Sequence, residues 1–266
     1  MKRQGEHRSP CLMPNSMRMS PMLFTSFRSA IVLAVGLWMS AVEAGIVLNT
    51  TRVIYQGGDK EASFGVHNSG GGEILLQSWL EAPSSGDKVA ANLPFVVAPA
   101  LARMAGGSRQ LLRIIYAGTG LPQDRESVLW LNVQEIPQTA SENTLQIAIR
   151  QRIKVFFRPQ GLKEDPAQAP EMLRWRLLKG DVLEVENPGP YHVSMLKLST
   201  RQGGKELASL ESHMLSPGQS LRLTLMHKSG NGPVALSFIS INDFGGQVPY
   251  QATLKGEQVT LASKTR

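Results

Sequence analysis

The sequence predicts an all-β protein made of two immunoglobulin-like β-sandwich domains. Short runs of β-branched and aromatic residues alternate with clusters of Gly, Pro, Asn and Ser, which is typical of antiparallel strands joined by turns. No run repeats at a fixed period, which argues against a solenoid. The chain beyond residue 44 is long enough for two sandwiches of about 100 residues each.

The predicted strands differ in length, and the runs expected to form them are 45–55, 62–67, 74–80, 109–117, 127–134, 144–158, 182–186, 192–199, 220–225, 234–241 and 247–254. The run 144–158 is far longer than the usual strand of about 5–6 residues. A polar, Pro-rich stretch at 161–170 follows it and predicts the domain boundary. We therefore expect an N-terminal domain at 45–163 and a C-terminal domain at 164–266.

Residues 1–44 are predicted to be a cleaved secretory signal peptide. Basic residues precede an apolar run at 30–39, and the stretch Ala41-Val-Glu-Ala44 supplies the small residues of a cleavage site before Gly45. The run is shorter than the roughly 20 apolar residues that span a membrane. The true start could be Met17, Met19 or Met22. The expected location of the mature protein is the periplasm.

Cysteine and charge narrow the functional classes further. The one cysteine, Cys11, falls in the predicted signal peptide, so the mature chain would have neither a disulfide nor a catalytic thiol. Setting aside the five Lys/Arg and two Asp/Glu of residues 1–44 leaves a net charge of about +4. Without a run of Lys or Arg, this mild excess does not predict binding to nucleic acid.

Several stretches of the mature chain form a recognisable series. They are Asn49-Thr-Thr-Arg-Val-Ile-Tyr55, Leu121-Pro-Gln-Asp-Arg-Glu-Ser127, Leu145-Gln-Ile-Ala-Ile149, Arg152-Ile-Lys-Val-Phe-Phe-Arg-Pro159, Val185-Glu-Asn-Pro-Gly-Pro-Tyr191 and Ile241-Asn-Asp-Phe-Gly-Gly246. In order and spacing they resemble the periplasmic pilus (fimbrial) chaperone family of the chaperone-usher pathway, whose best-known member serves P pili. The resemblance implies two immunoglobulin-like domains in a boomerang arrangement.

The resemblance also implies a function. The protein would fold, stabilise and cap fimbrial subunits by donor-strand complementation, and would deliver them to the outer-membrane usher for pilus assembly. It would need no cofactor or metal, would not insert stably in a membrane, and could associate with itself when free of subunits. The short connection 136–143 resembles that of chaperones for rod-like fimbriae.

Two cations match the family's anchor for the C-terminal carboxylate of the subunit. They are Arg52 and Lys154, each inside a matched motif. An Arg fork pairs with both carboxylate oxygens and a Lys adds a compact charge. Since Lys154 precedes Val155, Phe156 and Phe157, an anionic partner would offset the cost of placing it among them. The alternative is that both are ordinary surface cations.

Three aliphatic residues match the family's donor strand. Leu145, Ile147 and Ile149 alternate along one face of an expected strand, where they would fill the groove of an incomplete subunit sandwich. The alternative is that they face the core of their own domain. Alternation puts them opposite Lys154, so a bulge or strong twist would have to intervene.

Three charged residues match the family's buried triad between the domains, which would fix the angle between them. They are Glu126, Arg158 and Asp243, and the alternative is three unrelated surface charges. The chain also departs from the family pattern. Pro99-Ala100 stands where the family has a Pro-Pro pair, which weighs against a cis-proline turn there.

Other functional classes find little support in the sequence. The histidines lack metal-ligand spacing and no Gly-x-Ser-x-Gly elbow is present, so neither an enzyme nor a metal site is expected. Trp79, Trp130 and Trp175 are expected in a core or on a strand face. Two rival hypotheses remain, a pilus subunit or adhesin and a secreted Ig-like carbohydrate-binding module. The first normally has a disulfide, and the second needs an aromatic groove from a chain that is only 6% aromatic.

Overall fold

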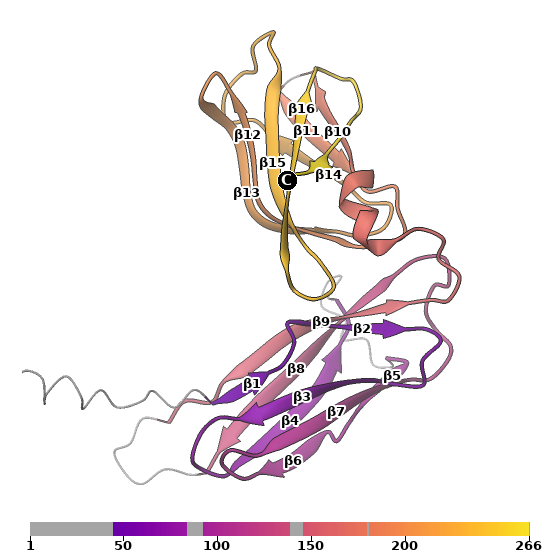
Figure 1. Ribbon diagram of the computed structural model, residues 1–266, viewed down its shortest axis with the longest axis vertical. Helices are drawn as coiled ribbons and strands as arrows, with labels where there is room; N and C mark the ends of the chain where they lie inside the picture. The colour runs from indigo at the N-terminus through magenta and orange to yellow at the C-terminus, as the bar shows by residue number, and fades with distance from the viewer. Residues whose placement is uncertain (1–44, 84–92, 139–145, 180, 266) are drawn as a thin grey trace, which may run out of the picture. The chain divides into compact units, whose positions relative to one another are not determined.

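The computed structural model describes residues 45–83, 93–138, 146–179 and 181–265 (Figure 1). Their strands form two β-sandwiches, one from β1–β9 and one from β10–β18, so the predicted fold class is confirmed. The predicted signal peptide at 1–44 lies outside the described residues. Within the described ranges, no helix is long and apolar enough to cross a membrane.

The first sandwich packs a four-stranded sheet against a five-stranded one. The four-stranded sheet has the order β1 (Ile46–Leu48), β3 (Ala62–Asn68), β7 (Arg109–Tyr116), β5 (Phe95–Ala98). The five-stranded sheet has the order β2 (Arg52–Gln56), β9 (Arg150–Arg158), β8 (Ser127–Pro137), β4 (Ile74–Glu81), β6 (Leu101–Met104). The pairing of β2 with β9 is parallel, whereas the sequence predicted antiparallel sheets throughout.

The second sandwich follows the short 3-10 helix η1 (Pro166–Met172) and has the same two-sheet plan. Its smaller sheet has the order β14 (Ser220–Thr224), β11 (Val182–Glu186), β10 (Arg174–Leu178), β17 (Thr260–Leu261). Its larger sheet has the order β13 (Lys205–Leu215), β12 (Val193–Gln202), β15 (Val234–Ile241), β16 (Gln247–Leu254), β18 (Ser263–Lys264).

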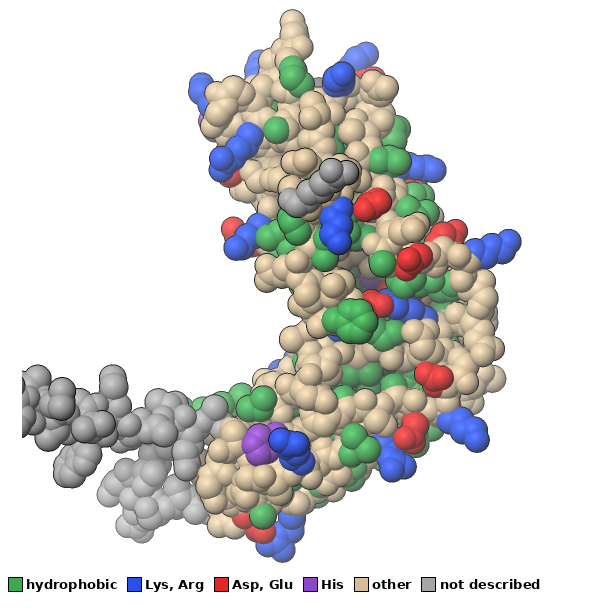
Figure 2. Space-filling view, in the orientation of Figure 1, with side chains coloured by type: hydrophobic (Ala, Val, Ile, Leu, Met, Phe, Trp, Pro, Cys, Tyr) green, Lys and Arg blue, Asp and Glu red, His purple; other side chains and the backbone are tan. Residues whose placement is uncertain are grey.

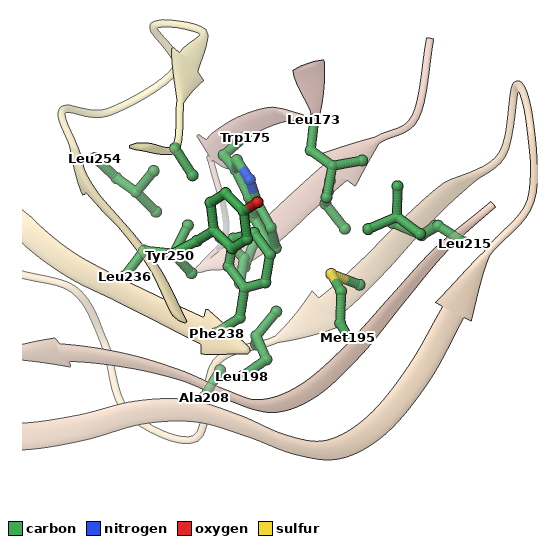
Figure 3. Close-up of a cluster of buried hydrophobic side chains, with 14 of the residues drawn as sticks. Leu173, Trp175, Met195, Leu198, Ala208, Leu215, Leu236, Phe238, Tyr250 and Leu254 are labelled. Carbon is green, nitrogen blue, oxygen red and sulfur yellow. The ribbon is translucent and has the colours of Figure 1, made fainter. Parts of the chain in front are cut away.

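Each sandwich has its own hydrophobic core, formed by the inward side chains of alternating strands. In the first, the rings of Tyr55, Phe95, Tyr116 and Phe157 lie with centroids 4.5–6.4 Å apart. In the second, Phe238 lies between Trp175 and Tyr250, with ring centroids 5.3 Å away on both sides (Figure 3). Two separate cores account for two domains that need no disulfide.

The run predicted at 45–55 is two strands in different sheets. Between β1 and β2, the Asn49 side chain accepts a hydrogen bond from the Gly65 backbone N–H (3.0 Å), and the Thr50 hydroxyl bonds to Arg52. The local bonds between Thr50 and Arg52 compete with the strand ladder. The break lets the chain change sheets, and it places Arg52 at the start of β2.

Two further expectations were wrong. The long strand predicted at 144–158 begins only at Arg150, because residues 146–149 are not in the ladder that joins β8 to β9. The peptide bond Ala98–Pro99 is cis, although Ala100 replaces the second proline of the family pattern. A cis bond requires a proline only on its C-terminal side, and Pro99 supplies it.

Candidate functional site

The parallel pairing of β2 with β9 sets Arg52 beside Lys154. The two residues are register partners on neighbouring strands, which lie about 4.8 Å apart. Their side chains share the outer face of the sheet, since the alternate residues Val53 and Val155 point into the core. The structure thus brings together the two cations that the motifs singled out separately.

Arg52 is only partly satisfied by the chain itself. Its Nη1 donates a hydrogen bond to the carbonyl oxygen of Ile241 (3.1 Å), and its guanidinium lies 5.6 Å from the centre of the Phe156 ring. Its Nε is buried and has no hydrogen-bond partner among the described residues. Burial lowers the pKa of Arg52, although the carboxylates of Asp243 and Glu126 oppose this effect.

Lys154 is a half-buried cation that forms no ion pair within the described part of the chain. Its Nζ lies 5.5 Å from the centre of the Trp130 ring, which also has the Arg152 guanidinium at 4.4 Å. Burial lowers the pKa of the Lys154 ammonium, and the positive charge of Arg52 lowers it further. The positive charge of Arg52 therefore disfavours the charged form of Lys154 in the absence of an anion.

Arg158, at the far end of β9, is fully paired. Its Nε donates to Glu126 Oε1 (2.7 Å), while Nη1 and Nη2 donate to the two carboxylate oxygens of Asp243 (2.6 and 2.7 Å). Burial would lower the pKa of Arg158, but the bonds to Asp243 and Glu126 outweigh it and raise the pKa. The three residues of the expected triad lie in direct contact and join β9 to the turn between β15 and β16.

Sequence reasoning missed a fourth member of this network, His192. Its backbone N–H and its Nδ1 both lie 2.8 Å from Glu126 Oε2, and its ring centre lies 5.7 Å from that of Phe156. The side chain is almost fully buried. The only available signal was its position directly after the matched motif that ends at Tyr191. As a result, both Glu126 oxygens accept hydrogen bonds, which a buried carboxylate requires.

The expected donor residues lie just ahead of β9. Ile147 is 66% exposed and Ile149 is 42% exposed, so neither packs in the core of its own domain; Leu145 lies outside the described residues. The Ile149 carbonyl accepts a hydrogen bond from the Glu135 N–H (3.0 Å), which ties the segment to the end of β8. From Arg150 to Phe157 the register with β8 has no shift, so the expected bulge is absent there.

The described residues offer little basis for other chemistry. No group of three or more His, Cys, Asp or Glu among them could hold a metal ion. Figure 2 shows Lys and Arg side chains spread singly over the face in view, with Asp and Glu among them, rather than gathered in one basic patch. Trp175 is in the core, while Trp79 and Trp130 lie on a strand face beneath Arg150, Arg152 and Lys154. The arrangement is best suited to binding a carboxylate next to an exposed aliphatic segment.

Comparison with known proteins gives a consistent result. The family described as pili and flagellar-assembly chaperone, PapD N-terminal domain, matches residues 45–163, and the pili assembly chaperone PapD, C-terminal domain, matches residues 168–252. The chaperone protein FimB/FhaD of Bordetella pertussis is 39% identical over 225 residues, which cover 80% of this chain and 90% of that protein.

Solved structures agree with these matches. The crystal structure of the YadV chaperone has 35% identity and a TM-score of 0.67, with 79% of this chain and all of the other covered. A chain from the complex of the Salmonella enterica SafA pilin with the SafB chaperone has 30% identity and a TM-score of 0.65, with 79% and 97% covered.

Proposed function

Because this chain belongs to the PapD family of pilus-assembly chaperones, we propose that it holds the C-terminal carboxylate of a fimbrial subunit between Arg52 and Lys154. The family is one of assembly chaperones, and the protein is a fimbrial chaperone and not an enzyme. Its membership argues against both a pilus subunit and a carbohydrate-binding module.

The single observation that carries the anchor proposal is the unpaired, half-buried cation pair. A carboxylate bound there would accept hydrogen bonds from the Arg52 guanidinium, of which only Nη1 donates within the described chain, and from Lys154 Nζ. Its negative charge would also offset the repulsion between Arg52 and Lys154 that lowers the pKa of Lys154. Each charge-assisted bond contributes about 1.5–3 kcal/mol to such binding.

The segment ahead of β9 supplies the second half of the proposal. Ile147 and Ile149, with Leu145, add a strand to the subunit and fill the groove left by its missing strand. Their exposure supports this role, since side chains that served their own core would be buried. The pairing of a pilin with a chaperone in the SafA–SafB complex supports subunits as the partner class.

The remaining steps follow from the same hypothesis. The predicted signal peptide exports the chain to the periplasm, where it captures subunits as they emerge and hides their grooves. The outer-membrane usher then replaces the chaperone strand with the extension of the next subunit. The triad of Arg158, Glu126 and Asp243 fixes the position of the second sandwich, so that both sandwiches meet the same subunit.

Co-purification tests the function directly. The tagged chain is isolated from periplasm, and the bound proteins are identified by mass spectrometry and compared with those bound by Arg52→Ala and Lys154→Ala. We expect fimbrial subunits with the parent chain and at least a tenfold loss with either variant, while both variants keep the parent's free energy of unfolding. Equal subunit recovery in all three would refute the anchor. Lys205→Ala, which removes an exposed cation of the second sandwich, serves as the matched control.

A further inference from the structure

The turn between β15 and β16 exposes a large aromatic side chain. Phe244 is 96% exposed, the highest value among the exposed large hydrophobic residues of the described chain. Keeping a Phe side chain in water forgoes the stabilisation that its burial would give. Single exposed apolar residues are common on proteins, so exposure alone does not make this residue a contact.

The turn that carries Phe244 is held in one conformation. Asn242 Oδ1 accepts hydrogen bonds from the backbone N–H groups of Phe244 (3.1 Å) and Gly246 (2.8 Å). The Asn242 N–H donates to the Gly246 carbonyl (2.9 Å), and the Gly245 N–H donates to the Asn242 carbonyl (3.0 Å). The backbone at Phe244 is therefore fixed, which reduces the entropy lost when a partner binds its ring.

The same turn is fastened to the cationic end of β2 and β9. Asp243 bonds to Arg158, and the Ile241 carbonyl accepts the hydrogen bond from Arg52. Gly245 has a φ of +80°, and a Cβ there would collide with the hydroxyl of Thr51, so the turn lies directly against the residue before Arg52. Phe244 is thus held close to the proposed anchor.

A hollow of about 450 Å³ joins the ring to the anchor. Arg52 is the member of the anchor that lines it, next to the apolar side chains of Phe156, Phe244 and Val248. The charged side chains of its lining are of both signs, and besides Arg52 they are Arg158, Lys264, Glu126, Asp165, Glu171 and Asp243. An extended chain advances at most about 3.3–3.6 Å per residue, and Phe244 is three residues from the carbonyl that holds Arg52. The Cα atoms of Ile241 and Phe244 are therefore at most about 11 Å apart, a span that three to four residues of an extended peptide cover.

We propose that Phe244 is a further subunit contact, which packs against an apolar side chain within the last four residues of the bound subunit. The contact rests on the proposed carboxylate anchor and adds selectivity to it. Any chain end offers a carboxylate, whereas only some chain ends offer an apolar side chain next to it. Phe244 thus favours chain ends that are apolar just before the terminus.

The test uses a synthetic peptide with the last twelve residues of the subunit that co-purifies with the parent chain. A second version has a C-terminal amide, and a third has glycine in place of the apolar residues among the last four. Their affinities are measured by fluorescence anisotropy for the full chain and for Phe244→Ala, Phe244→Trp and Arg52→Ala. Met226→Ala removes another exposed apolar side chain, 58% exposed, and is the matched control.

We expect Phe244→Ala to weaken binding of the parent peptide about tenfold and to leave binding of the glycine peptide unchanged. Phe244→Trp should retain affinity, and its added fluorescence should shift to shorter wavelength on binding. The contact is refuted if Phe244→Ala binds the parent peptide as tightly as the original chain, or weakens both peptides equally.

Failure of the anchor has a different signature. If neither amidation of the peptide nor Arg52→Ala changes the affinity, the proposed carboxylate site is wrong. The Phe244 contact is still tested separately, because the affinities of the original chain and of Phe244→Ala are compared for the parent peptide and for the glycine peptide. Because the Phe244 side chain is almost fully exposed, its removal should not alter the free energy of unfolding, and a denaturation curve checks this.

Discussion

Lys154 and Arg158 lie four residues apart on the same face of β9, yet their electrostatic surroundings are opposite. Arg158 donates three hydrogen bonds to the carboxylates of Glu126 and Asp243, and its pKa is raised. Lys154 has no carboxylate partner in the described chain, and burial lowers its pKa. The strand therefore has one cation that stabilises the chain and one that remains open to a partner.

This difference suggests how to separate structural from functional charges. Removing a buried cation that is paired with carboxylates of the chain is strongly destabilising, since the carboxylates lose their partner. A half-buried cation without a partner already carries a desolvation cost, so its removal should leave stability unchanged or slightly improved. Removing Arg158 should therefore lower the free energy of unfolding, whereas removing Lys154 should weaken subunit binding and leave the free energy of unfolding unchanged or slightly higher.

The largest expected effect on stability is at Arg158. Arg158→Ala leaves Glu126 buried without its cation and frees Asp243, and we expect a loss of about 3–5 kcal/mol in the free energy of unfolding. Urea denaturation followed by circular dichroism measures it. Arg152→Ala, which breaks an exposed pair with Glu81, should cost at most about 1 kcal/mol. Equal losses in the two variants would contradict the assignment of Arg158 as structural.

The next largest effect is expected on binding, at the segment ahead of β9. Ile147→Ser removes an aliphatic side chain that is 66% exposed in the free chain, and should weaken subunit binding by about 1.5–3 kcal/mol through lost burial. The free energy of unfolding of Ile147→Ser should equal that of the parent chain. Val96→Ser, at a residue 60% exposed on β5, is the matched control and should leave binding intact. A binding loss shared by both variants would remove the case for a donor segment.

The sequence predicted best those features that depend on local pattern. The runs 234–241 and 247–254 coincide with β15 and β16, because regular alternation ends at clear turn residues on both sides. By contrast, β13 (Lys205–Leu215) was missed. It is an edge strand whose Ser, Glu and His residues at exposed or half-exposed positions hide the alternation.

Features of the site that depend on tertiary pairing could not be derived from local pattern, and the pairing of Arg52 with Lys154 was expected only because their motifs resemble those of the family. Nothing in the order of residues shows that β2 runs parallel to β9, and that pairing alone makes Arg52 a neighbour of Lys154. His192 reaches Glu126 across 66 positions of sequence without any spacing signal. Phe244 lies inside a matched motif, but the sequence of a turn shows neither how exposed a side chain is nor which residues surround it.

A smaller effect is expected from the lowered pKa of Lys154. Only the protonated ammonium pairs with a carboxylate, and a bound carboxylate would raise its pKa again. Affinity for subunits should therefore be highest at neutral pH and fall a few-fold as the pH rises toward about 10.4, the ordinary pKa of lysine. Titration calorimetry from pH 7 to 10 measures this. Lys154→Arg should remove the dependence, since arginine stays charged; the same decline in that variant would assign it to another group.

The smallest effect concerns a fully paired charge in the second sandwich, where the rule derived from β9 should also hold. Glu184, on β11, accepts hydrogen bonds from Arg222 (2.8 Å) and pairs with Arg176 (2.7 Å), and these bonds lower its pKa. A carboxyl with a lowered pKa stabilises the fold at neutral pH and loses that contribution as the pH falls below about 4.3. In Glu184→Gln, stability should therefore fall less steeply than in the parent chain as the pH drops below about 4.3. Subunit binding should be unchanged. Thermal unfolding between pH 3 and 7 checks the first outcome, and a change in subunit affinity would show that paired charges outside the first sandwich also serve the partner.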